Sequence, residues 1–180
     1  MSATTYIALL RGINVGGRHP VPMAELRALA EALGGTDVRT YVNSGNLVLR
    51  SGAAPARLEA ELEGALERRF GFPVPVILRR AGQWPEYVAS NPFPERSGHE
   101  SRAVMLALPK RAPAADAVAR LQERAAAGEV IVGAGDVIWI YYAAGFGGSR
   151  LTPALLDRAA GSPVTTRNWR TVLAIAQLIG

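Results

Sequence analysis

The chain has 180 residues, of which 49% are hydrophobic, so it can bury one ordinary core or two small ones, and a disordered chain is excluded. It has no cysteine, which excludes disulfides, thiolate zinc sites and cysteine nucleophiles and fits a cytosolic protein. Its net charge of +5 is carried almost wholly by arginine, because Lys110 is the only lysine, and this favours an anionic partner.

In the first half, the hydrophobic pattern predicts strands and helices in the order βαββαβ. The expected strands are 5–11, 38–42, 46–50 and 74–79, and the expected helices are 22–33 and 55–70. The helix that begins at Val21 and Pro22 has no Ser, Thr, Asp or Asn at its cap position. Its first N–H groups therefore need another partner.

The second half restarts this pattern after a segment, 81–101, that is expected to hold one short helix and then a Pro-, Ser- and Gly-rich connector. The elements expected next are a strand at 102–109, a helix at 112–128, a hairpin at 129–145 and a helix at 151–161 capped by Thr152. Where the first half has its fourth strand, the second half is expected to have only a terminal helix. The predicted fold class is therefore α+β, with two ferredoxin-like βαββα lobes and an added C-terminal helix. The expected lobes are 1–90 and 102–180, joined by a connector at 91–101.

In such a topology the first two strands run parallel, so the loop after the first strand and the turn after the second lie at one edge. Three loop glycines can adopt backbone angles that let successive N–H groups point at one acceptor. The edge is expected to gather Arg11, Gly12, Asn14, Gly16, Gly17, Arg18, Asn43, Ser44 and Asn46. Two interpretations stay open: the edge binds an anion or a carbonyl oxygen, or Asn14 or water caps the helix and the glycines only make room.

The stretch "TTRNWRTV" (165–172) is expected to start the terminal helix, with Thr166 as its N-cap and Trp169 in the core. Arg167 and Asn168 either tie this helix to a neighbouring loop or close an anion-binding groove with the first lobe. Bracing is favoured for Asn168, whereas the two roles are nearly balanced for Arg167. We therefore expect Asn168→Ala to lower the melting temperature by more than Arg167→Ala. The full set of predicted ligand-binding residues is Arg11, Asn14, Gly16, Gly17, Arg18, Ser44, Asn46, Arg167 and Asn168.

Catalytic and metal-binding patterns are sparse. His19 and His99 lie in loops without carboxylates at metal-ligand spacing beyond the adjacent Glu100, so we expect no metal and no cofactor. Ser44 lacks the strand-to-helix elbow of a hydrolase nucleophile, and no catalytic residue can be assigned. An enzyme of unknown reaction therefore stays an alternative to a protein that binds a small anionic ligand.

Nucleic-acid binding is the second alternative, because ferredoxin-like sheets can stack single-stranded bases on exposed aromatic side chains. In the first lobe the strand faces are aliphatic, which argues against it. In the second lobe Trp139 and Tyr141 share one strand face, although core packing explains them better. The apolar runs are far shorter than the roughly 20 residues of a membrane span, so we expect a cytoplasmic protein without a membrane partner. Nothing in the sequence indicates the oligomeric state.

Five segments together carry a resemblance to a known family: "YIALLRGINVGG", "VPMAELRALAEALG", "VRTYVNSGNLVL", "NPF" and "TTRNWRTV". In this order they are similar to successive signatures of the uncharacterised bacterial family known as domain of unknown function 1697 (DUF1697), and they run from residue 6 to residue 172. The resemblance implies a two-lobed α+β fold and a cytosolic bacterial protein. It implies no established activity, cofactor or partner.

Overall fold

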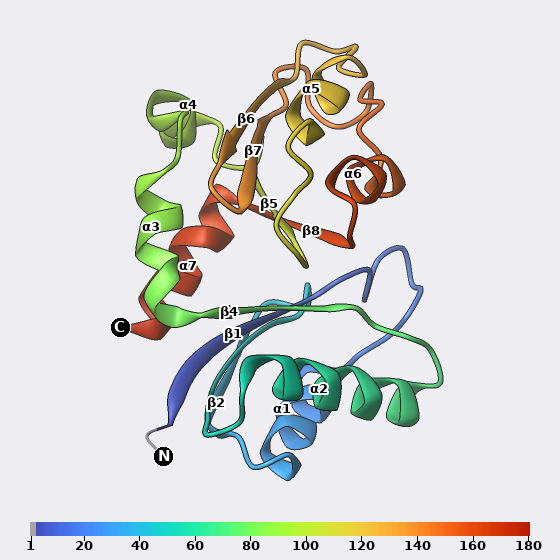
Figure 1. Cartoon of the computed structure of the whole chain (residues 1–180), viewed down its shortest axis with the longest axis vertical. Helices are drawn as coiled ribbons and strands as arrows, with labels where there is room; N and C mark the ends of the chain where they lie inside the picture. Colours follow the sequence, from blue (N-terminus) through green and yellow to red (C-terminus); the bar gives the residue numbers. More distant parts are fainter. Residues whose placement is uncertain (1–2) are drawn as a thin grey trace. The chain divides into compact units, whose positions relative to one another are not determined.

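The computed structural model of the chain describes residues 3–180. These residues form an α+β structure with two four-stranded antiparallel sheets and seven α-helices (Figure 1). They divide into two units. Unit 1 comprises the described residues up to Trp84 together with Ile175–Gly180, and unit 2 comprises Pro85–Ala174.

The elements of unit 1 follow the predicted order. They are β1 (Thr4–Leu10), α1 (Met23–Ala32), β2 (Thr36–Tyr41), β3 (Asn46–Ser51), α2 (Pro55–Phe70) and β4 (Val76–Arg80). The strand order is β2-β3-β1-β4, and β3 is antiparallel to both β1 and β2. Because β1 and β2 are both antiparallel to β3, they run in the same direction, and their C-terminal ends lie at one edge of the sheet, as predicted.

The core of unit 1 lies between its sheet and two helices. Side chains alternate along a strand, so Tyr6, Ala8 and Leu10 of β1 share one face, and they belong to one buried cluster with residues of α1 and α2. Both helices cover this face of the sheet (Figure 1). Helix α2 has the predicted bounds, since Pro55 suits the first turn of a helix and Gly71 ends it with φ 80°.

Unit 2 begins inside α3 (Trp84–Ala89), which follows a 3-10 helix (Ala81–Gln83) at the end of unit 1. Its other elements are α4 (Pro94–His99), β5 (Val104–Pro109), α5 (Ala117–Gln122), β6 (Val130–Ala134), β7 (Val137–Tyr141), α6 (Pro153–Ala160), β8 (Val164–Asn168) and α7 (Trp169–Ile179), with the boundary between the units inside α7. The strand order is β6-β7-β5-β8. As predicted, Thr152 caps α6 by accepting a hydrogen bond from the Leu155 N–H.

Three predictions for unit 2 are wrong. Segment 81–101 was expected to hold one short helix and then a connector without helix, but α4 lies inside the expected connector 91–101. Helix α5 is shorter than 112–128, and the N–H groups of Arg124 and Ala125 already bond back to Leu121 in closing turns. Residues 164–168 were expected to precede and begin a helix, but they form β8, a fourth strand. The backbone of β8 pairs with β5, and Thr166 lies opposite Ala107. Hydrogen bonds to this distant strand satisfy the backbone N–H groups of the segment, so they need no partner from a helix cap.

The start of α7 moves accordingly. The side-chain oxygen of Asn168 accepts a hydrogen bond from the Thr171 N–H at 2.9 Å, so Asn168, and not Thr166, caps the terminal helix. Arg167 lies in a strand and does not share a helix face with Arg170. Unit 2 therefore has the element order βαββαβ, the same as unit 1.

Candidate functional site

The connection from β1 to α1, residues 11–22, is called the edge loop, and it contains a small hairpin. The N–H of Asn14 donates to the His19 carbonyl and the N–H of Arg18 donates to the Val15 carbonyl, both at 3.0 Å. Gly16 and Gly17, at the tip, have φ of 56° and 75°. A two-residue turn of this kind needs positive φ at both central positions, so the glycines make the tip possible.

Asn14 ties the edge loop to its surroundings. Its side-chain Nδ2 donates to the carbonyls of Val21 and Asn43, at 3.0 and 2.7 Å, and its Oδ1 accepts from the Val21 N–H at 2.8 Å. Asparagine tolerates the left-handed backbone found here, with φ 54°. Every polar atom of the Asn14 side chain is thus engaged by the protein, which fixes the loop beside the turn and beside the start of α1.

The turn between β2 and β3, residues 42–45, is called the edge turn. Asn46 is fully buried, and its Nδ2 donates to the Tyr41 carbonyl at 2.8 Å and to Ser44 Oγ at 3.0 Å. A Cβ on Gly45 would lie 2.7 Å from Leu10 Cβ, so only glycine fits against β1. Ser44 and Asn46 therefore lie at the predicted edge, where both side chains brace the edge turn.

A hollow of about 300 Å³ lies between the edge loop and the edge turn. We call it the edge hollow; its lining residues are Asn14, Gly17, Arg18, Pro20, Val21, Pro22 and Asn43. Arg18 is exposed, and its side chain forms no ion pair or hydrogen bond within residues 3–180. The hollow thus combines an unpaired guanidinium with backbone and amide groups.

The N-terminus of α1 adjoins this hollow through Pro22, its N-cap residue, which provides no side-chain hydrogen bond. The N–H groups of Met23, Ala24 and Glu25 have no carbonyl partner inside the helix, since the first turn of any helix leaves its donors free. The helix dipole adds partial positive charge at the same end. The charge of Arg18 and the helix terminus therefore favour a negatively charged group in the edge hollow.

Of the other predicted site residues in unit 1, Gly16 lies at the exposed hairpin tip, and Arg11 lies at the start of the edge loop. The N–H of Arg11 donates to the Pro75 carbonyl at 3.0 Å. The sequence analysis placed Asn43 at the edge but not among the ligand-binding residues, and it left out three other residues that line the hollow: Pro20, Val21 and Pro22. These three carry no polar side chain that would signal a site.

Arg167 and Asn168 belong to unit 2. Arg167 is 6% exposed, and its Nη1 donates to Thr165 Oγ1 at 2.7 Å and to the Thr166 carbonyl at 2.9 Å. Burial lowers the pKa of Arg167 to about 10. Both residues have structural partners in unit 2, and a groove that they would share with the edge loop stays a prediction.

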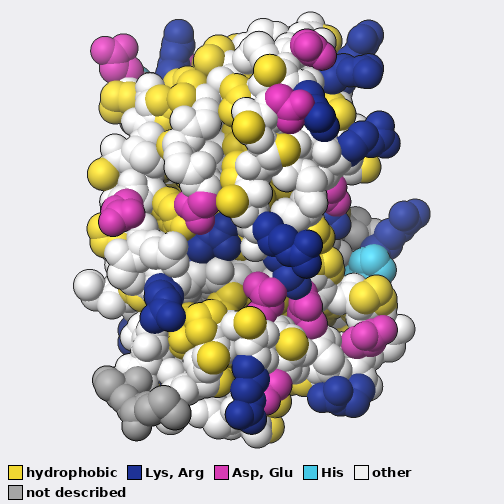
Figure 2. Space-filling view, in the orientation of Figure 1, with side chains coloured by type: hydrophobic (Ala, Val, Ile, Leu, Met, Phe, Trp, Pro, Cys, Tyr) yellow, Lys and Arg dark blue, Asp and Glu magenta, His cyan; other side chains and the backbone are white. Residues whose placement is uncertain are grey.

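Trp139 and Tyr141 do not form an exposed stacking platform. Trp139 is fully buried, packs against Trp169 with ring centroids 5.8 Å apart, and donates its indole N–H to Ser90 Oγ. Tyr141 is 8% exposed, and its hydroxyl donates to Glu100 Oε2 at 2.6 Å, which raises its pKa. On the face seen in Figure 2, basic side chains are interspersed with acidic ones. These features do not favour base stacking.

Two features are absent from residues 3–180. In this range no three His, Asp or Glu side chains come together as a group that could hold a metal ion. No helix in the same range has both the length and the apolar character that crossing a membrane requires.

Comparison with known proteins adds a family and a fold. The family model described as "Protein of unknown function (DUF1697)" matches residues 3–139. Among solved structures, the chain is similar to the conserved bacterial protein SP0830 from Streptococcus pneumoniae, with 24% sequence identity and a TM-score of 0.76 over 99% of this chain and 100% of that one. This likeness shows a shared fold. No curated protein matches the chain.

Proposed function

Since the chain belongs to the DUF1697 family of proteins of unknown function, we propose from its own geometry that it is a cytosolic protein that binds a small anion in the edge hollow. The observation that carries this proposal is the position of Arg18, an unpaired guanidinium beside the uncapped N-terminus of α1. Helix N-termini bind phosphate and carboxylate groups through free N–H donors and the helix dipole. A phosphate- or carboxylate-bearing metabolite is the class of ligand that this chemistry would recognise.

The residues around the hollow have different roles in this proposal. Arg18 supplies charge, and Gly17 leaves its backbone accessible, because a Cβ there would have no atom within 4 Å. Asn14 and Asn46 hold the loop and the turn in place through the hydrogen bonds described above. Arg11, Gly16 and Ser44 lie at the same edge but do not line the hollow, so in this proposal they support the loop and the turn. The proposal needs no contribution from unit 2.

Backbone strain at the edge turn supports a function there. Val42 has φ 48° and is 50% exposed. A β-branched residue in the left-handed region is unfavourable, and such residues cluster at functional sites. Val42 is the neighbour of Asn43, which lines the edge hollow.

We also infer that each unit is ferredoxin-like. The support is the element order βαββαβ together with the strand orders β2-β3-β1-β4 and β6-β7-β5-β8, in which the third strand lies between the first and the second. In this arrangement the loops that follow the first and second strands share an edge, and the edge hollow lies between two such loops.

The test uses inorganic phosphate and follows the melting temperature as phosphate is added. A ligand that binds only the folded protein stabilises it by RT ln(1 + L/Kd), where L is the ligand concentration, so the melting temperature rises with L and the dependence gives the apparent affinity. We expect Arg18→Ala to weaken the apparent affinity for phosphate about tenfold, the equivalent of one charged contact. Arg50→Ala is the control with the same substitution, since Arg50 lies opposite Thr5 in the sheet, away from the edge hollow. If both variants respond to phosphate as the wild type does, the proposal is wrong.

A further inference from the structure

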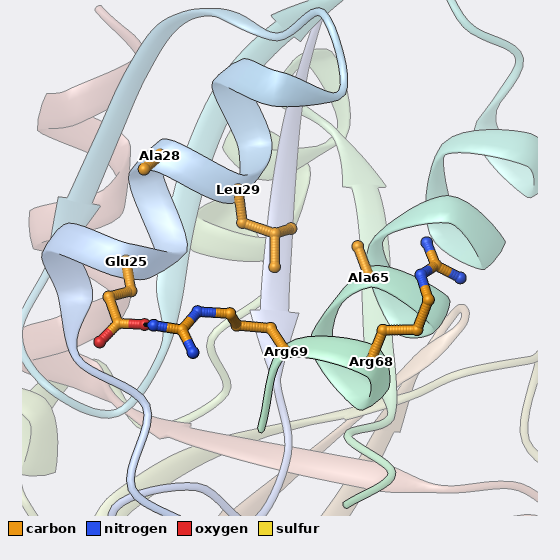
Figure 3. A pocket seen from close by; sticks show the side chains of 6 residues that line it. All are labelled: Glu25, Ala28, Leu29, Ala65, Arg68 and Arg69. Carbon is orange, nitrogen blue, oxygen red and sulfur yellow. Dashed lines mark ion pairs between the residues drawn. The ribbon is translucent and has the colours of Figure 1, made fainter. Parts of the chain in front are cut away.

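A groove between α1 and α2 is a second concave feature of unit 1, and it shares no lining residue with the edge hollow. We call it the helix groove. Its volume is about 570 Å³, within the range of small-molecule sites. Side chains at helical spacing line it from both helices: Glu25, Ala28, Leu29, Ala65, Arg68 and Arg69 (Figure 3). Apolar and basic side chains thus meet in one groove.

Two of the charged residues compensate each other. Arg69 reaches across from α2 and forms an ion pair with Glu25 of α1 (Figure 3). Arg68 points elsewhere, and its side chain forms no ion pair or hydrogen bond with any residue from 3 to 180. The helix groove therefore presents one positive charge that the protein does not balance.

The Arg68 guanidinium lies over Gly64 on the surface of α2. A Cβ on Gly64 would be 3.1 Å from Arg68 Nη1, which is the far end of a flexible side chain and could move by a few tenths of an ångström to make room. The backbone of Gly64 does not need glycine, because its φ is not positive, and alanine would be the more stable residue inside a helix.

We propose that the helix groove binds a small carboxylic acid with an apolar body. The carboxylate pairs with the Arg68 guanidinium, whose planar donors match a carboxylate in two parallel hydrogen bonds. The apolar body covers Leu29 and Ala65, which Figure 3 shows on facing helices. This site is separate from the edge hollow, so either proposal can fail without the other.

The probe is octanoate, titrated into the full chain and followed by the backbone amide resonances in NMR spectra. We expect saturable shifts in α1 and α2 centred on Leu29 and Ala65. Octylammonium has the same tail and the opposite charge, so we expect it not to produce these shifts. Arg68→Ala is expected to weaken octanoate binding about tenfold. Arg57→Ala, a change at the other end of α2 where Arg57 pairs with Glu61, is expected to leave binding unchanged.

Gly64→Ala tests whether helix stability and binding are independent. We expect a higher melting temperature, because alanine is the better helix former, and nearly unchanged octanoate affinity, because the flexible Arg68 guanidinium can shift slightly to make room. The proposal is overturned if Arg68→Ala keeps the wild-type affinity for octanoate. It is also overturned if octylammonium binds as well as octanoate does, or if the octanoate shifts lie outside α1 and α2.

Discussion

The two units share an element order but differ at the edge where their first two strands end. In unit 1 the first connection is the edge loop, residues 11–22, which has positive φ at Gly12, Asn14, Gly16, Gly17 and His19. In unit 2 the corresponding connection is 110–116, and no described residue in it has positive φ. The edge turn 42–45 likewise corresponds to the shorter turn 135–136. Because unit 2 forms the same sheet with shorter connections, the fold does not require the longer ones of unit 1.

The two units also differ in the exposure and the side-chain partners of their predicted site arginines. Arg18 in unit 1 is exposed, lines a hollow and has no side-chain partner within residues 3–180. Arg167 in unit 2 is buried and bonded to Thr165 and Thr166. Arg18 is available to a ligand, whereas Arg167 supports the fold. Truncation of Arg18 should therefore weaken ligand binding, and truncation of Arg167 should lower stability.

The largest expected effect is the loss of stability in Arg167→Ala. Removing a buried side chain leaves a cavity and unpaired partners at Thr165 and Thr166, so we expect a loss of about 3 kcal/mol in the free energy of unfolding. Arg18→Ala changes an exposed residue and should stay within about 0.5 kcal/mol. Urea unfolding of both variants measures the difference. Similar losses in the two variants would remove the contrast between the units.

Asn14→Ala should have the next largest effect. It removes two hydrogen bonds to Val21 within the edge loop and one to the Asn43 carbonyl of the edge turn, and we expect a loss of about 2 kcal/mol, because water can reach part of the site. Asn14→Asp keeps the acceptor for the Val21 N–H but sets a carboxylate oxygen against the carbonyls of Val21 and Asn43, so its urea midpoint should also lie below that of the wild type. A midpoint of Asn14→Ala equal to that of the wild type would show that the loop is not held by this side chain.

Asn168→Ala should cost about 1 kcal/mol, the usual value of an N-cap. This ranking reverses the one expected from sequence, in which Asn168 outweighed Arg167, because Arg167 is a buried strand residue and Asn168 serves one helix end. Asn168→Asp retains a capping oxygen and should melt close to the wild type. A larger loss in Asn168→Ala than in Arg167→Ala would restore the original ranking.

The smallest effect concerns acid stability in unit 2. Burial alone would raise the pKa of Glu129, but hydrogen bonds from Ser149 and the Ala127 N–H lower it overall. A carboxyl group whose pKa is lower in the folded protein stabilises it above its ordinary pKa of 4.5, and this contribution is lost as the pH falls through the folded value. Stability measured from about pH 6 down to about pH 3 should therefore fall more steeply in the wild type than in Glu129→Gln. Parallel profiles would assign the acid sensitivity to other carboxyl groups.

The sequence predicted an element well where one segment contained both its hydrophobic pattern and the residues that start and end it. Helix α2 is the clearest case, with Pro55 at its start and Gly71 after its end. The common edge of the loop and turn also followed from strand order. Strand β8 was missed because Thr165, Thr166 and Asn168 have side chains typical of helix caps, and only pairing with β5 makes them a strand.

The candidate site was predicted less completely, for a related physical reason. Topology placed Asn14 and Asn46 at the edge but could not show whether their amides face a ligand or the protein. That depends on partners distant in sequence, such as the Asn43 carbonyl for Asn14. Arg18 was identified correctly as an edge residue, and its lack of a side-chain partner within residues 3–180 is visible only in three dimensions.

The most direct test of anion binding by unit 1 is an amide NMR titration of the wild-type chain with inorganic phosphate. We expect saturable shifts in the edge loop, at Asn43 and in the first turn of α1, with the corresponding connection of unit 2, residues 110–116, unchanged. Shifts of equal size in both connections, or none in the edge loop, would contradict anion binding in the edge hollow.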